Sequence, residues 1–184
     1  CAGCYRTFKE SYQRLKDERG LEVRVVHITE LLDQLADKGR IAFSARRPVR
    51  VTYHDPCHLG RLGGVYESPR RLIERVKGAQ LVEMRTNHSY AHCCGAGGGV
   101  KSTHPRLSTQ VARQRIDEAL EINSDLLVTA CPFCKTNLNE ASNQLIKVID
   151  IVEYLAENST TKTTEAKTET RRSTSEESSE TGFP

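Results

Sequence analysis

Short apolar stretches alternate along the chain with segments of helical periodicity. Val49, Val51 and Tyr53 are separated by single residues, and Leu126 opens an apolar run that is too short for a helix. Short runs rich in β-branched residues are typical of strands. We therefore predict strands at residues 23–27, 49–53, 81–84, 126–129 and 147–151.

Helices are predicted between these strands. Leu107, Val111 and Ile116 recur close to the helical period of 3.6 residues, after a start near His104-Pro105. Ser followed by Pro at residues 68–69 is a second good helix start. The other helices are expected at residues 5–19, from a cap at Thr29 to Gly39, from Ser68 to near Gly78, after Cys134, and in a short final segment to Asn158.

Alternating strands and helices predict an α/β fold, a mostly parallel sheet with flanking helices. Residues 40–48 are expected to form a linker. The predicted strands at 49–53, 81–84 and 126–129 each run toward a group of cysteines. Ligands of parallel sheets bind outside the carboxyl ends of the strands. We therefore expect the cysteines to lie on loops at one edge of the sheet.

Composition sets the ends and excludes some functions. Residues 159–184 contain no Val, Ile, Leu or Tyr, so we predict a disordered tail. Residues 1–158 suffice for one domain with a core. The net charge is only +3, with mixed signs and no basic stripe, which argues against nucleic-acid binding. No apolar run approaches the roughly 20 residues that span a bilayer, so no direct membrane span is expected.

The chain has seven cysteines and no visible secretory signal. This combination indicates a reducing, cytoplasmic compartment and a metal site in place of disulfides. The chain begins with Cys1 and not with Met, so we expect an excerpt of a longer protein.

Five of the cysteines have the pattern Cys57, Cys93-Cys94, Cys131-x-x-Cys134, and the other two form Cys1-x-x-Cys4. Thiolates suit zinc or iron–sulfur clusters. Two Cys-x-x-Cys pairs, Cys1-Cys4 and Cys131-Cys134, would make one tetrahedral zinc site. That site leaves Cys57 and the adjacent pair unexplained, so a multinuclear iron–sulfur centre is favoured. Zinc, and thiol redox chemistry or disulfides, stay open as alternatives.

The two Cys-x-x-Cys pairs open similar stretches. Each pair is followed by a helix and then by Ile-x-Glu, at residues 28–30 and 151–153. We interpret this as a duplicated unit whose first copy is cut at the start. Chance similarity of two short segments is the alternative.

The motifs His54-Asp-Pro-Cys-His-Leu-Gly60 and Cys93-Cys-Gly-Ala-Gly-Gly-Gly99, followed by Cys131-Pro-Phe-Cys134, resemble the cysteine-rich CCG domain. Cys1-Ala-Gly-Cys-Tyr-Arg-Thr-Phe8 resembles the end of the first of two such motifs. The family includes the catalytic D-type and B-type subunits of heterodisulfide reductases, which are the most similar. It also includes iron–sulfur subunits of glycolate oxidase, of lactate-utilisation complexes and of anaerobic glycerol-3-phosphate dehydrogenase.

The resemblance implies a division of the chain and a cofactor. Residues 1–48 would be the remnant of a first CCG repeat, residues 49–158 a complete second repeat, and residues 159–184 the tail. In this family each complete motif holds a non-cubane [4Fe-4S] cluster. The implied ligands of one cluster are Cys57, Cys93, Cys94, Cys131 and Cys134. Cys1 and Cys4 would be part of a second ligand set, which would give two clusters in the full-length protein.

The resemblance also implies an activity. Its members reduce a disulfide, and the implied substrate is the mixed disulfide of coenzyme M and coenzyme B. Electrons would come from a partner subunit, which is a cytochrome, a flavin protein or a ferredoxin-like iron–sulfur protein. A membrane partner would place the chain at the inner face of the membrane. The excerpt alone is expected to be inactive.

Three further groups have predicted roles. Residues 95–102 nearly match a phosphate-binding loop, but Val100 stands where the template needs Gly. We therefore interpret Gly95, Gly97 and Gly98 as backbone that approaches the cluster. His58 is a candidate proton donor to a departing thiolate, and His54 and His92 are interpreted as supporting residues. Five arginines are interpreted mostly as solvated surface, with docking of an anion as the alternative: Arg46, Arg47, Arg61, Arg70 and Arg71.

Two alternatives to disulfide reduction stay open. In the first, the same cluster only relays electrons, in a subunit of a glycolate or lactate oxidase or of an anaerobic glycerol-3-phosphate dehydrogenase. In the second, the chain is a zinc-binding structural module.

Overall fold

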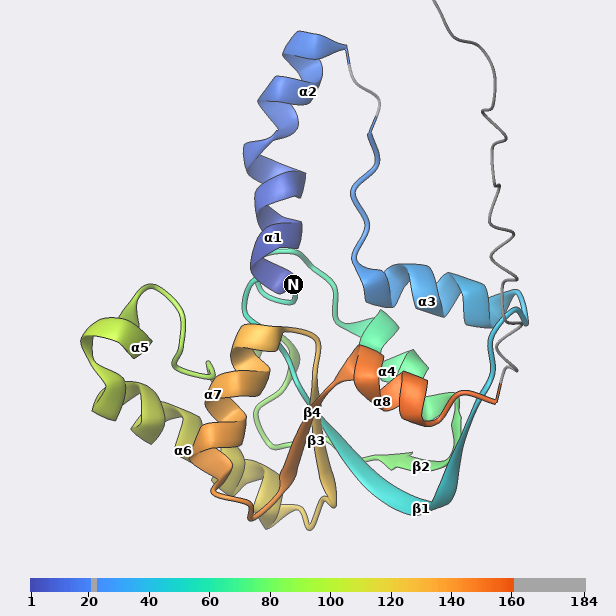
Figure 1. Ribbon diagram of the computed structural model, residues 1–184, viewed down its shortest axis with the longest axis vertical. Coiled ribbons are helices and arrows are strands. Elements are labelled where there is room, and N and C mark those ends of the chain that lie inside the picture. The colour runs from blue at the N-terminus through green and yellow to red at the C-terminus, as the bar shows by residue number, and fades with distance from the viewer. Residues whose placement is uncertain (21–22, 161–184) are drawn as a thin grey trace, which may run out of the picture.

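The computed structural model describes residues 1–20 and 23–160. Its centre is a sheet of four parallel strands in the order β2-β1-β3-β4, as Figure 1 shows. The strands are β1 (Phe43–His54), β2 (Val76–Leu81), β3 (Leu126–Thr129) and β4 (Lys147–Asp150). The prediction of an α/β fold with a parallel sheet is confirmed.

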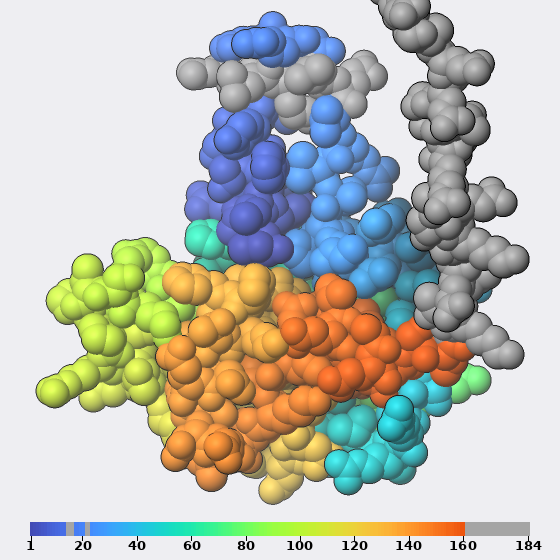
Figure 2. Space-filling model, viewed as in Figure 1, coloured from blue at the N-terminus to red at the C-terminus, as the bar shows by residue number. Residues whose placement is uncertain are grey.

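Helices cover both faces of this sheet. α3, α4 and α8 lie on one face, and α6 and α7 lie on the other (Figure 1). The helices are α1 (Ala2–Arg6), the π-helical η1 (Thr7–Ser11), α2 (Gln13–Arg19), α3 (Ile28–Asp37), α4 (Glu67–Glu74), the 3-10 helix η2 (His88–Tyr90), α5 (Val100–Thr103), α6 (Pro105–Glu121), α7 (Pro132–Ser142) and α8 (Ile151–Glu157). The segment from α1 to α2 projects from the packed body, as Figure 2 shows.

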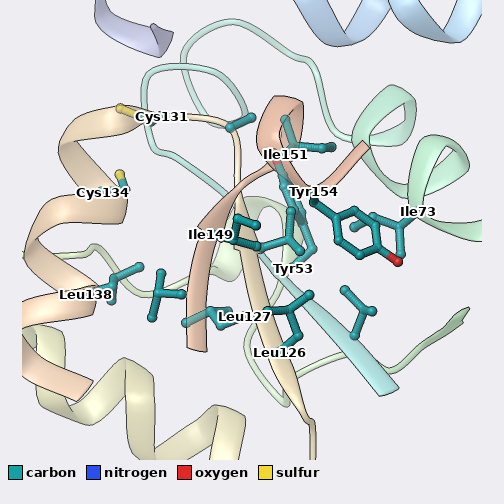
Figure 3. Packing of buried hydrophobic residues seen from close by; sticks show 14 of the residues in the cluster. Tyr53, Ile73, Leu126, Leu127, Cys131, Cys134, Leu138, Ile149, Ile151 and Tyr154 are labelled. Atoms are coloured by element: carbon teal, nitrogen blue, oxygen red, sulfur yellow. The ribbon is translucent and has the colours of Figure 1, made fainter. Parts of the chain in front are cut away.

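The core lies where strands and helices meet. Tyr53, Leu127 and Ile149 come from three adjacent strands, and each is at most 3% exposed. Ile151 and Leu138 contribute from the helices, as Figure 3 shows. All four residues of β3 are buried, which fits a central strand covered on both faces.

The order of the strands creates a crevice at one edge of the sheet. The chain leaves β1 for β2 through α4, on one face, and leaves β3 for β4 through α7, on the other face. β1 and β3 are neighbours, with His54 paired to Thr129 at their carboxyl ends. Ligands of open α/β sheets bind at such a switch point. Cys57 follows one of these strands and Cys131 follows the other.

Two predicted strands are wrong. Residues 23–27 are not a strand, because none of the four described strands lies beside them to form a hydrogen-bonded ladder. The strand predicted at 81–84 lies earlier, at β2, which contains Gly78 with a φ of +88°. Cys93 therefore does not follow a strand directly. The helix that was expected to reach Gly78 ends at Glu74 in α4.

Residues 40–48 are not a linker, because β1 already begins at Phe43. The pairing with β2 shifts between Ser44 and Val49, and Pro48 lies inside this irregularity. A proline lacks the backbone N–H of a regular ladder and is tolerated at such a break.

The cap predicted at Thr29 is also wrong. His27 is the N-cap of α3, its side chain accepts the N–H of Thr29, and Glu30 returns a bond to the N–H of His27. Asp150 and Glu153 form the same capping box at the start of α8. The two stretches that suggested an internal repeat therefore share this local geometry, while the duplication itself stays a prediction.

The predicted tail begins with two described residues. Ser159 forms a β-bridge with Phe43, and the N–H of Thr160 donates to the carbonyl of Ala42. The remainder of the predicted disordered tail lies outside the described residues. Among residues 1–20 and 23–160, no helix is both long enough and apolar enough to cross a membrane.

Candidate metal centre

Five cysteines meet at the carboxyl edge of the sheet. Their thiols form a continuous chain of contacts within hydrogen-bonding reach, in the order Cys57, Cys93, Cys94, Cys134 and Cys131. Three separate loops supply them. Cys94, Cys131 and Cys134 are buried, whereas Cys57 and Cys93 are partly exposed. The arrangement therefore leads from the interior to the surface.

The N-terminus of α7 supplies two of these thiols. Cys131 is the N-cap residue of α7, and Cys134 lies in its first turn. Figure 3 shows both sulfur atoms at this end of the helix. Backbone N–H groups at a helix N-terminus are unpaired and favour negative charge. Bonds from the Cys134 thiol and from the N–H groups of Cys134 and Phe133 lower the pKa of Cys131 to about 5.

The loop with Cys93 and Cys94 is fixed by backbone contacts. The N–H of Gly95 donates to the Cys93 sulfur at 3.3 Å, and the N–H of Ala96 donates to the Cys94 sulfur. Asn137 on α7 is buried, and its amide donates to the carbonyl of Cys94 at 2.6 Å. The two loops that contribute the buried sulfurs are thereby held together.

Gly95 is the glycine that this packing needs. It has a φ of +80°, and a Cβ at this position would lie 2.8 Å from the carbonyl oxygen of Ser108 on α6. Gly97 and Gly98 lie in open space, where a Cβ would meet nothing within 4 Å. Gly95 thus approaches the thiols as predicted from the sequence, while proximity of Gly97 and Gly98 to a cluster stays a prediction.

The five thiols cannot all be ionised without a cation. Bonds donated by the thiols of Cys57 and Cys94 lower the pKa of Cys93 to about 2. The same bonding to Cys93, together with burial, raises the pKa of Cys57, and bonds to Cys131 and Cys94 raise the pKa of Cys134. Some sulfurs thus keep their protons to stabilise neighbouring thiolates. Bound metal cations would remove this restraint and make all five sulfurs available as ligands.

A buried polar network lies beside these sulfurs. His54 is 1% exposed, and its Nδ1 is 3.2 Å from the Nε of Arg115. Arg115 on α6 is fully buried and also donates to the carbonyl of Thr86 and to Glu118. The second carboxylate oxygen of Glu118 is 2.6 Å from Nδ1 of His92, the residue before Cys93. The network connects the end of β1 to the Cys93 loop through α6.

Burial, and then the charge of Arg115, lower the pKa of His54 to about 3, so the ring is neutral. A ring nitrogen of His54 and the sulfurs of Cys94 and Cys134 all lie within 4.8 Å of one another. Nε2 of His54 is buried and has no hydrogen-bond partner among the described residues. A group of soft donors with an unsatisfied polar atom aimed at it fits an iron–sulfur cluster held by thiolates.

The remaining predicted site residues lie at the border of this centre. His58 is partly buried, its backbone N–H donates to the Cys57 sulfur, and its Nδ1 lies near Gly3. Cys1 and Cys4 are exposed. The backbone N–H of Ala2 donates to the Cys131 sulfur, so the α1 segment lies against the five-cysteine group.

The interpretation of the arginines as solvated surface is wrong for Arg70. Its side chain is 5% exposed and makes a two-pronged ion pair with Asp55 and a second with Glu83. Arg61 donates to the carbonyls of Ser89 and Ala91 and so holds the segment before Cys93. Arg71 pairs with Asp33 of α3. These residues position loops and helices and are not free to dock an anion.

Sequence reasoning missed Asp55, Arg115 and Asn137. Asp55 was quoted only as part of a motif, and its position next to Pro56 and Cys57 was the available signal. Arg115 and Asn137 lie on helices, where a polar residue normally faces solvent. Each is buried because its partner lies on a distant loop, and nothing in the local sequence marks that partner.

Together, the parallel sheet and the thiol-lined crevice define an α/β domain built to hold a multinuclear metal centre. Residues 51–139 match the family model of the CCG cysteine-rich domain. Over these residues the chain belongs to that family, as its motifs predicted.

The chain is similar to several known proteins. It is 45% identical over 160 residues to the D-type subunit of the Dihydromethanophenazine:CoB–CoM heterodisulfide reductase of Methanosarcina acetivorans, an alignment that covers 85% of the chain. It is 36% identical over 161 residues to the B-type subunit of the fumarate reductase (CoM/CoB) of Methanothermobacter marburgensis, with 84% of the chain covered. It is 35% identical over 159 residues, or 83% of the chain, to the probable iron-sulfur-binding oxidoreductase FadF of Bacillus subtilis.

The chain is much shorter than these relatives. It spans 39%, 30% and 22% of their respective lengths.

Proposed function

We propose that the chain is part of an iron–sulfur oxidoreductase subunit that reduces a disulfide. The observation that carries the proposal is the continuous group of five thiols at the switch point of the sheet. The names of the relatives support it, because they describe a heterodisulfide reductase subunit and iron–sulfur oxidoreductases.

The cofactor would be a [4Fe-4S] cluster of the non-cubane type. Its ligands would be Cys57, Cys93, Cys94, Cys131 and Cys134. When bound, it supplies single electrons to a substrate that needs two. Backbone N–H groups of residues 58, 95, 96 and the start of α7 already donate to the sulfurs, and such bonds tune a reduction potential.

The substrate would be a mixed thiol disulfide such as that of coenzyme M and coenzyme B. Its reduction consumes two electrons and two protons and breaks the S–S bond into two thiols. His58 is placed to supply one proton, because it follows Cys57 and is partly exposed, so its imidazole can exchange protons with solvent. Cys57 and Cys93 mark the exposed side of the group, from which a substrate would approach.

Electrons would come from a partner subunit, either a cytochrome, a flavin protein or a ferredoxin-like protein. Two of the relatives named above are themselves subunits of reductases, which supports an assembly of several chains. We place the chain in the cytoplasm, at the inner face of the membrane where the partner is a membrane protein. A second cluster, with Cys1 and Cys4 among its ligands, would belong to the longer protein, and the chain alone would lack disulfide reductase activity.

A second candidate is an electron-relay subunit without a disulfide substrate. The similarity to a fumarate reductase subunit and to FadF favours it, since neither name specifies a disulfide reductase. The third candidate, a zinc-stabilised structural module, rests only on the thiols.

Metal and sulfide analysis tests these candidates. We expect about four iron atoms and four acid-labile sulfides per chain after anaerobic reconstitution, together with a paramagnetic signal. Cys94→Ser should lose most of this content, while His58→Gln should retain it. Stoichiometric zinc without sulfide would contradict the redox proposal.

Substrate binding separates the first two candidates. Addition of the disulfide should change the paramagnetic spectrum of a disulfide reductase and leave that of an electron relay unchanged. In the full-length enzyme, unchanged turnover by His58→Gln would exclude the proton-donor role.

A further inference from the structure

His54 is the residue that the proposed function leaves without a task. It is buried at the end of β1, three positions before Cys57, and is not one of the five cysteines. A ring nitrogen of His54 lies within 4.8 Å of the sulfurs of Cys94 and Cys134, and these two sulfurs lie equally close to each other. By residue type and distance alone, the three residues resemble a zinc site with one His and two Cys ligands.

Arg115 decides which nitrogen of His54 carries the proton. A guanidinium is always protonated and can only donate hydrogen bonds. Its Nε lies 3.2 Å from Nδ1 of His54, so Nδ1 must accept and must carry no hydrogen. A neutral imidazole then carries its hydrogen on Nε2. Nε2 is thus a donor, with no lone pair for a metal ion.

The position of Arg115 is itself fixed. Its Nη1 donates to the carbonyl and the hydroxyl of Thr86 and to the carboxylate of Glu118. Thr86 also donates to Glu118 at 2.6 Å. Arg115 is fully buried, so these contacts leave it little freedom to release Nδ1 of His54.

Nε2 of His54 is buried and has no hydrogen-bond partner within the described part of the chain. A buried donor is normally satisfied, and one that is not indicates a missing acceptor. The nearest acceptors of suitable chemistry are thiolate sulfurs, or sulfide bound beside them.

We propose that His54 donates a hydrogen bond from Nε2 to a sulfur of the cluster, and that Arg115 is the positioning residue that fixes this tautomer. The inference rests on the proposed iron–sulfur function and assigns His54 a donor role in place of a ligand role. A donor to sulfur stabilises the more negative, reduced cluster, so His54 raises the reduction potential.

The test uses the full chain, labelled with ¹⁵N-histidine and reconstituted anaerobically with iron and sulfide. Pulsed electron paramagnetic resonance of the paramagnetic state should show a weak ¹⁵N coupling, typical of a hydrogen-bonded nitrogen. In deuterated buffer an exchangeable deuteron should couple with it. This measurement needs no variant and is independent of enzyme activity.

Variants assign the signal to His54. His54→Leu should lose the ¹⁵N coupling and shift the midpoint potential to a more negative value. His54→Gln should also lose the coupling but recover the potential toward the wild-type value, because an amide can accept from Arg115 and donate to sulfur. His104→Gln is the matched control, since His104 is exposed at the start of α6, and it should leave both readouts unchanged.

Several results would overturn the inference. A strong ¹⁵N coupling of an iron-bound nitrogen would make His54 a ligand. A wild-type coupling that persists in His54→Leu would assign it to another histidine, and an unchanged potential in His54→Leu would remove the tuning role. A wild-type chain that binds no iron and sulfide would contradict the proposed function and this inference together, whereas the other results leave the proposed function intact.

Discussion

Asp55 shows how one residue can hold the loop that carries a site residue. Its side chain is 3% exposed, and both carboxylate oxygens accept from Arg70, at 2.7 and 2.9 Å. One of them also accepts the backbone N–H of His88, at 2.9 Å. Asp55 thus connects the end of β1 to α4 and to the segment before Cys93. A buried ion pair of this kind is costly to break from one side, because the remaining charge stays in the interior.

Asp55→Asn should therefore lower the free energy of unfolding by about 3 kcal/mol, because Arg70 loses its main counter-charge. Urea denaturation of the metal-free chain measures this change. Glu10→Gln is the control, since it breaks an ion pair with Arg6 that is 2.9 Å long but largely exposed. Its cost should stay below about 0.5 kcal/mol. Equal losses in the two variants would show that burial of the Asp55 pair has no special weight.

His27 makes the stability of the chain depend on pH. Burial lowers the pKa of His27 to about 4, and its Nδ1 caps α3 by accepting the N–H of Thr29. The unfolded chain would titrate this group near a pKa of about 6.5 and so binds more protons between the two values. The free energy of unfolding should thus be constant above neutral pH and fall as the pH drops from about 6.5 toward 4. The low pKa of His54 acts in the same direction.

His27→Asn should make this dependence shallower, because Asn is a good N-cap and does not titrate. Urea denaturation of the metal-free chain at several pH values between 4 and 7 checks the slope. Replacement of the exposed His104 by Asn should leave the slope as in the wild type. A slope that is the same in His27→Asn and in the wild type would refute the assignment to His27.

At the scale of elements, the contact between the Cys93 loop and α6 depends on Gly95. A Cβ at Gly95 would lie 2.8 Å from the Ser108 carbonyl oxygen and 2.9 Å from Cβ of Val111, on a backbone with positive φ. Gly95→Ala should push the loop away from α6 and cost about 2 kcal/mol in stability. It should also reduce iron and sulfide per chain by more than half, because Cys93 and Cys94 would move.

Gly97→Ala is the matched control for this prediction, since a Cβ there meets nothing within 4 Å. Iron, sulfide and the urea midpoint should stay at wild-type values in this variant. Wild-type iron content in Gly95→Ala would show that the loop has room to adapt.

Elements with a strong local signal were predicted well from the sequence. β3 was predicted at its observed bounds, and α6 was predicted to begin at its observed start, because an apolar run and a His-Pro start are local features. Residues 23–27 carry a similar pattern but do not form a strand. A strand exists through its neighbours, and the pattern of one segment does not reveal whether a partner lies beside it. The same limit displaced the strand at 81–84 to β2.

At the scale of the whole molecule, the topology brings the cysteines together. Cysteines that follow adjacent parallel strands must meet at one edge, so the convergence of Cys57 and Cys131 was predictable. The residues that support them were not, since Arg115 and Asn137 reach their partners only after the chain has folded. Supporting residues depend on distances between elements, which local patterns do not encode.

The N-terminal segment packs against this edge without placing its own cysteines in the group. Ala2 and Tyr5 are buried, and the N–H of Ala2 donates to the Cys131 sulfur. Cys1 and Cys4 are exposed and make no hydrogen bond to the five thiols in the part of the chain that the structure describes. The two Cys-x-x-Cys pairs can therefore be tested separately.

Paired substitutions distinguish the two possible ligand sets. If the five cysteines hold the cluster, a chain with Cys1→Ser and Cys4→Ser should keep about four iron atoms and four sulfides after reconstitution. A chain with Cys131→Ser and Cys134→Ser should lose nearly all of both. A tetrahedral zinc site made from both pairs predicts instead that either double variant loses the metal, because each removes two of four ligands. Metal and sulfide analysis of the two variants, beside the wild-type chain, decides which half of the protein binds the metal: loss in both supports the zinc site, and loss only in the second supports a cluster held by residues 49–158.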